Sequence, residues 1–165
     1  MPYVRFIGDD IADIFSVPQD EIETQWINDN DPRLMARDLA AAVAAKQREV
    51  DQYLDVLGGE GVEWPAASGK FVQYRERDQG KVTAQAVKAG LAKQGLVSWA
   101  PTAWISADNS PIPLITPEDM IALGNRISTI VEAAIKHARV HKNAIAALTT
   151  VEAVNTYDYT TGWPA

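Results

Sequence analysis

Two histidines are the first candidates for chemistry in this chain. His137 and His141 stand four residues apart, the spacing that places two imidazoles on one face of a helix for a metal ion. The pair lacks the glutamate that follows the first histidine of a metalloprotease helix, and the chain has no cysteine to complete a zinc site. The sequence therefore favours a partly exposed helix face beside Lys136, Arg139 and Lys142, and predicts no metal.

Acidic residues and glycines form the other patterns that resemble reactive sites. Asp9, Asp10 and Asp13 lack the spacing and the closing glutamate of a calcium loop, so a solvated turn is the better interpretation. The stretch "GGEGVEW" precedes a strand-like run and contains no Lys-Ser/Thr pair, unlike a phosphate-binding loop. We expect no catalytic residue and no cofactor, and an enzyme remains a remote alternative.

The charge balance argues against two classes of partner. The 165 residues carry a formal net charge of −7, which repels phosphate backbones and anionic lipids. No apolar run approaches the roughly 20 residues needed to cross a bilayer, and the first residues do not resemble a secretory signal. We therefore expect a soluble protein of the cytoplasm that binds neither nucleic acid nor membrane.

The elements around these residues begin with an N-terminal arm, residues 1–32. Two apolar runs flank Gly8-Asp9-Asp10, a pattern that predicts a β-hairpin within residues 3–17. The stretch from residue 18 to residue 31 has no hydrophobic period. The large apolar residues of the arm therefore need a surface elsewhere, either on a partner or on the arm's own domain. We interpret four of them as partner-binding residues: Phe6, Ile7, Phe15 and Trp26.

The remainder, residues 33–165, predicts a helix-rich α+β domain. One Ala-rich helix is expected from Asp31-Pro32 to about Leu57, ended by Gly58-Gly59, and another from about Asp78 to Gln94. The motif "TPEDM" opens a long C-terminal helix, and Thr149 with Glu152 predicts the cap of a short last helix.

Short strands are expected between these helices. They cover residues 62–64, residues 70–74, a segment centred on Trp104 and residues 112–115. The whole chain is thus predicted to be a single α+β domain with short β-hairpins, preceded by an extended arm.

Trp163 raises a separate question because it lies two residues from the chain end, where apolar side chains are seldom buried. Gly162 permits a turn and Pro164 stiffens the end, so the indole is able to fold back on its own domain. We predict that Trp163 is mostly buried within its own chain, near Trp104 or the long helix.

From about Ala45 to Pro164 the order of features resembles a domain of unknown function found in tailed-phage proteins. Three pieces carry the resemblance most specifically: "DNSPIPLITPEDMIALGNRI", the preceding tryptophan, and the closing "YD" and "GWP". Members of that family are small proteins, or parts of larger ones, associated with tail fibres and fibre assembly. The resemblance implies protein–protein binding and supplies no catalytic residues.

Two roles remain open on this basis. The first is a virion component at the baseplate or tail-fibre attachment, present in the host cytoplasm during assembly. The second is a tail-fibre assembly chaperone that binds the fibre protein and then leaves. Whether the chain forms a homo-oligomer also stays open.

Overall fold

The computed structural model describes residues 2–7, 9–16 and 25–164, with only the backbone of Asp10 and Trp26. The residues form two compact units, one made of Met1–Arg48 and Asn143–Tyr157 and the other of Glu49–Lys142 and Asp158–Ala165. The helix-rich α+β class is confirmed. The predicted division at residue 32 stays a prediction.

The first unit contains a three-stranded antiparallel sheet. Its strands β1 (Tyr3–Ile7), β2 (Asp10–Phe15) and β3 (Gln25–Trp26) lie in the order β2-β1-β3. The expected hairpin is therefore present, whereas β3 falls in a stretch for which no element was predicted. Because β3 contains only two residues, it offers too short a run for a strand pattern to be recognised.

Helix α1 (Pro32–Glu60) begins as predicted and ends later than predicted. The Asp31 carboxylate accepts a 2.9 Å hydrogen bond from the backbone N–H of Arg33, as an N-cap residue does. The helix continues through Gly58 and Gly59, so the predicted stop there is wrong. Gly61 directly follows the last helical residue and has a φ of 87°. Helices commonly end at a residue in this left-handed conformation, which glycine adopts most easily.

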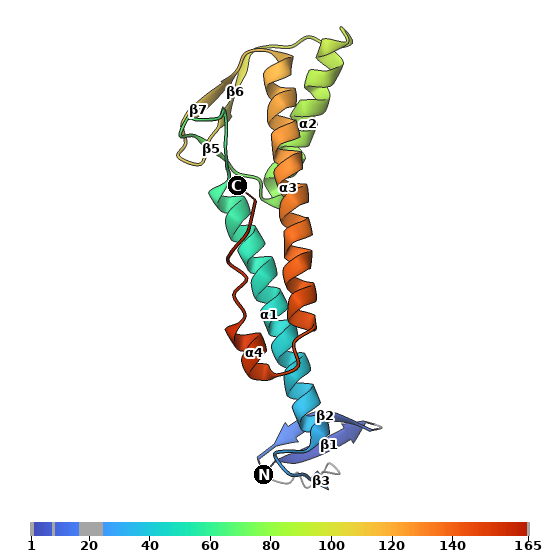
Figure 1. The fold of residues 1–165 in the computed structure, drawn as a ribbon. Coiled ribbons are helices and arrows are strands. Elements are labelled where there is room, and N and C mark those ends of the chain that lie inside the picture. The colour runs from blue at the N-terminus through green and yellow to red at the C-terminus, as the bar shows by residue number, and fades with distance from the viewer. Residues whose placement is uncertain (1, 8, 17–24, 165) are drawn as a thin grey trace. The chain divides into compact units, whose positions relative to one another are not determined.

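Two helices and two hairpins make up most of the second unit. Helix α2 (Glu76–Lys93) lies beside α3 (Pro117–Ala146), and the pair β6 (Thr102–Ile105) and β7 (Pro111–Leu114) forms the larger hairpin (Figure 1). The smaller hairpin pairs β4 (Val62–Glu63) with β5 (Phe71–Val72). All four strands fall where the sequence predicts them.

The start of α3 matches the "TPEDM" signal closely. The backbone N–H of Asp119 donates to the Thr116 hydroxyl at 3.2 Å, and the backbone N–H of Thr116 donates to the Asp119 carboxylate at 2.8 Å. This is a reciprocal capping box, with aspartate in place of the usual glutamate. Hydrogen bonds from the Thr116 backbone N–H and from its hydroxyl lower the pKa of the Asp119 carboxyl.

The short helix α4 (Val151–Thr156) is capped by Thr150, whose hydroxyl accepts from the Ala153 N–H at 3.2 Å. Thr149 was the predicted cap, so that prediction is wrong by one residue. Two adjacent threonines offer the same hydroxyl, and the sequence does not decide between them.

The main core belongs to the second unit. It joins side chains of both hairpins, α2 and α3, with Trp64, Trp99 and Trp104 packed partly buried against it. Its buried members are Val62, Val72, Tyr74, Val82, Ala89, Ile112, Leu114, Met120, Leu123, Ile127 and Ile130. The first unit has a separate small core of Val4, Ile27 and Leu34.

Candidate functional site

The four predicted partner-binding residues do not share one face of the N-terminal sheet. Phe6 lies on the face that packs on Val4, Ile27 and Leu34, and the guanidinium of Arg33 sits 4.6 Å from its ring centroid. Phe6 thus contributes to a core of its own chain.

Ile7 and Phe15 belong to the opposite face, called here the outer face of the sheet. Because side chains alternate along a strand, Ile7 points away from the side that carries Phe6, and 68% of Ile7 is exposed. Phe15 pairs directly with Tyr3, and opposed residues project to the same side. The side chain of Trp26 lies outside the described residues, so its prediction stays untested.

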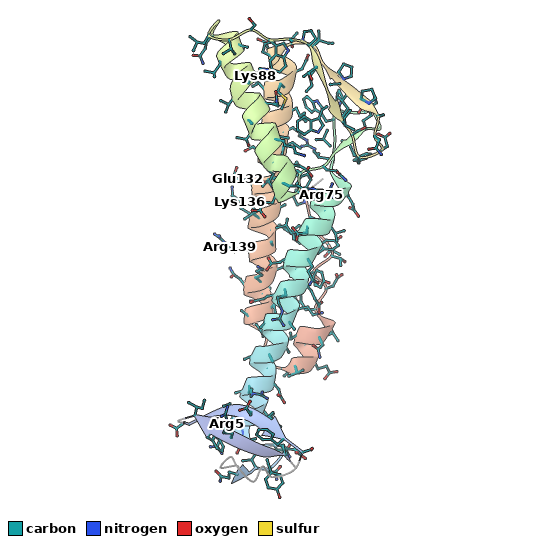
Figure 2. The ribbon with its side chains drawn as sticks, turned by 180° about the vertical axis from the view of Figure 1, so that it is seen from behind. Arg5, Arg75, Lys88, Glu132, Lys136 and Arg139 are labelled. Atoms are coloured by element: carbon teal, nitrogen blue, oxygen red, sulfur yellow. The ribbon has the colours of Figure 1, made fainter. Side chains whose placement is uncertain are left out.

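Arg5 and Asp13 also lie on the outer face, at opposed positions of β1 and β2, where they form an ion pair. Arg5 is labelled on the sheet in Figure 2. Strand β2 is an edge strand, and no described strand pairs with its far side. An edge with free N–H and C=O groups is a template for pairing with a strand of another chain. The outer face and this edge together form the candidate docking surface.

The C-terminal segment forms a second feature, the aromatic clasp, made of Tyr53, His137, His141, Tyr159 and Trp163. The Trp163 ring lies 5.5 Å from Tyr53, 5.0 Å from His137 and 5.6 Å from His141, measured between centroids. Its indole N–H donates to the Tyr159 carbonyl at 2.7 Å. The prediction that Trp163 folds back on the long helix is confirmed, and Trp104 is not its partner.

The sequence favoured a partly exposed helix face for both histidines. His137 is partly exposed, as predicted, whereas only 7% of His141 is exposed. Its Nε2 atom lies 3.0 Å from Nε2 of His137, which also lies 3.1 Å from the Thr161 carbonyl oxygen. The sequence alone missed this burial, since the covering segment comes from residues 158–164.

The electrostatics of the clasp favour a neutral His141. Burial lowers the pKa of its imidazole, and the nearby His137 lowers it further, whereas the Thr161 carbonyl and Asp158 partly oppose these effects. A neutral His141 is able to accept a hydrogen bond from His137, and two protonated rings at this distance would repel.

An apolar groove of about 700 Å³ runs along α2 and α3. Its lining includes Val82, Ala86, Val87, Val131 and Ile135. Glu132, also part of the lining, forms a 2.9 Å ion pair with Lys136 on the same helix (Figure 2). Polar side chains line it as well, among them Gln79, Asn125 and Ser128.

The carboxylates with shifted pKa values belong to caps and turns. Hydrogen bonds from Ser106 and Ser110 lower the pKa of Asp108 to about 2 in the β6–β7 turn, and those from Thr160 lower the pKa of Asp158. The Arg33 side chain and backbone lower the pKa of Asp31. Such carboxylates stay ionised and are poor proton donors.

Two further observations concern metals and membranes. Within residues 2–7, 9–16 and 25–164, there is no group of three or more His, Cys, Asp or Glu side chains placed to hold a metal ion. In the same part of the chain, no helix combines the length and the apolar character that a bilayer crossing needs.

Residues 36–161 match the family model described as "Domain of unknown function (DUF4376)". The chain belongs to this family. No curated protein and no solved structure matches the chain significantly. The matched region covers α2, α3, α4 and the histidine pair, and it begins after the N-terminal sheet.

Proposed function

We propose that this member of the DUF4376 family is a non-catalytic component of a phage tail. In this proposal it sits at the baseplate or the tail-fibre attachment and acts by binding another tail protein through the N-terminal sheet. The phage context comes from the sequence resemblance described above. The docking mode comes from the geometry of the sheet.

The observation that carries the proposal is the outer face of the sheet next to the edge of β2, with which no described strand pairs. Ile7 is the most exposed large apolar side chain of the described residues, at 68%. An incoming strand that pairs with β2 would cover the edge and bring side chains toward this face. The apolar side chains of Ile7 and Phe15 would then be removed from water, which favours binding.

A tail-fibre assembly chaperone is the second candidate. The same edge and face would serve a partner that is released before the particle is complete. The two roles differ in whether the protein remains in the finished particle, and mass spectrometry of purified particles separates them.

The docking surface is tested by substitution of Ile7→Lys, which places a charge on the outer face and leaves the small core of Val4, Ile27 and Leu34 intact. We expect incorporation into tails to fall about tenfold, the effect of losing ~1.4 kcal/mol of binding energy.

The matched control is Ile105→Lys, the same change on β6, where Ile105 is 56% exposed. It should leave incorporation unchanged. Equal loss in both variants, or no loss in Ile7→Lys, would contradict docking through the N-terminal sheet.

A further inference from the structure

We propose that His137, His141 and the backbone carbonyl of Thr161 form a binding site for a divalent transition-metal cation of the copper and nickel class. Three donor atoms converge there. The two imidazole Nε2 atoms are 3.0 Å apart, and the Thr161 oxygen lies 3.1 Å from Nε2 of His137. The inference does not depend on the proposed role in a phage tail.

The distance between the two Nε2 atoms favours a metal ion that binds its ligands at right angles over one that binds them tetrahedrally. Metal–imidazole bonds are about 2.0–2.1 Å long, so nitrogens 3.0 Å apart subtend an angle of about 95° at a shared ion. A tetrahedral ion prefers a wider angle, whereas the square-planar and tetragonal sites of Cu²⁺ and Ni²⁺ use right angles with nitrogen and oxygen donors. Cu²⁺ also stands highest in the general affinity order of divalent ions, which matters for a site with only two side-chain ligands.

The surroundings hold the donors in place. Trp163 stacks on His141 with 28° between the ring planes and meets His137 edge-on at 68°. Gly162, at a φ of 79°, lets the chain pass closely, since a Cβ there would lie 3.1 Å from Cε1 of His137. Rings fixed by neighbours lose little freedom when they bind a metal.

The charged groups nearby are compatible with a cation. Asp158 contributes a negative charge that acts on His141. Lys142 on the same helix forms an ion pair with Asp51 of α1, which neutralises part of its charge. Metal binding would displace the proton between the two rings, because a nitrogen that binds a metal must offer its lone pair.

The test uses the full chain and Cu²⁺ at neutral pH, read by electron paramagnetic resonance. The chain contains two histidines and no cysteine, so any imidazole nitrogen coupled to the copper comes from this pair. We expect one Cu²⁺ per chain with two coupled imidazole nitrogens. Copper bound by carboxylates alone, or coupling to one imidazole or none, would overturn the proposal, and this readout needs no variant.

Variants and competing metals give an independent measure of the same site. Substitution of His137→Gln should weaken Cu²⁺ binding by more than about tenfold, since even the loss of a group that only orients a ligand costs that much. Lys136→Gln, one residue away and exposed, is the matched control and should bind Cu²⁺ as the unmodified chain does. Tighter binding of Zn²⁺ than of Ni²⁺ would overturn the right-angle geometry.

Discussion

At the scale of single residues, Trp163 explains how the segment that follows α4 is held against α1 and α3. Its ring contacts one residue of α1 and two of α3, and its N–H bond to Tyr159 fixes the turn around Gly162. The sequence supplied the tryptophan, the glycine and the proline, which was enough to predict the fold-back. It did not supply the partners, because Tyr53 and the histidines lie far away along the chain.

Removal of the indole tests this contribution. We expect Trp163→Ala to lower the free energy of unfolding by about 1–3 kcal/mol, because a large, partly buried ring and its aromatic contacts are lost. Trp163→Phe keeps an aromatic ring and loses the hydrogen bond to Tyr159, so its cost should be nearer ~1 kcal/mol. Denaturant unfolding measures both, and an unchanged midpoint for Trp163→Ala would mean that the clasp does not stabilise the fold.

His141 should make stability depend on pH. Its pKa in the folded protein lies below the ordinary value of 6.5, so the folded state binds fewer protons than the unfolded state. The stabilisation is complete above pH 6.5 and is lost as the pH falls through this value toward the lowered pKa.

Unfolding measured between pH 7.5 and pH 5 should therefore show decreasing stability, by the linkage between proton binding and folding. His141→Gln should flatten this dependence, while the carboxylates common to both proteins act mainly at lower pH. Identical pH dependence in the two proteins would contradict a neutral, buried His141.

At the scale of elements, the close approach of α2 and α3 depends on a small residue. A Cβ added to Gly124 would lie 2.9 Å from the Cβ of Ala86, closer than real Cβ atoms come. Gly124→Ala should therefore cost about 1–3 kcal/mol of stability, as expected when a tightly packed contact is overfilled.

Gly90 in α2 is the matched control. An added Cβ at Gly90 meets no atom within 4 Å. Gly90→Ala should stabilise the protein by about 0.5–1 kcal/mol through helix propensity alone. Thermal unfolding distinguishes the two variants, and equal shifts of the same sign would contradict this account of helix packing.

Signals between neighbouring residues predicted the start of α3 and the hairpins well. The capping box of Thr116 and the turns of the hairpins rely on neighbouring residues, so their positions could be predicted from the sequence. Element ends that depend on tertiary contacts could not be predicted in this way. Gly58 stays helical where its sequence suggests a stop, with the Arg75 backbone nitrogen 3.3 Å from where its Cβ would be. The edge strand β2 was predicted, but which side chains its sheet exposes depends on strand register.

At the scale of the whole molecule, the N-terminal sheet and the main core use separate residues. Among residues 2–7, 9–16 and 25–30, which the structure describes, none belongs to the main core, whereas Leu34 of α1 completes the small core beneath the sheet. Deletion of residues 1–30 should therefore leave a folded, helical protein with a newly exposed Leu34. Circular dichroism with a cooperative thermal transition would agree with this expectation, and complete unfolding would mean that the sheet is required for the fold.

The central claim is that the protein remains in the phage tail, bound through its N-terminal sheet. Quantitative mass spectrometry of purified particles tests it most directly, with particles carrying the unmodified chain compared with those assembled with Ile7→Lys. The proposal predicts the unmodified chain in fixed stoichiometry with the major tail proteins and about tenfold less of the variant. Absence of the unmodified chain from complete particles would contradict the claim.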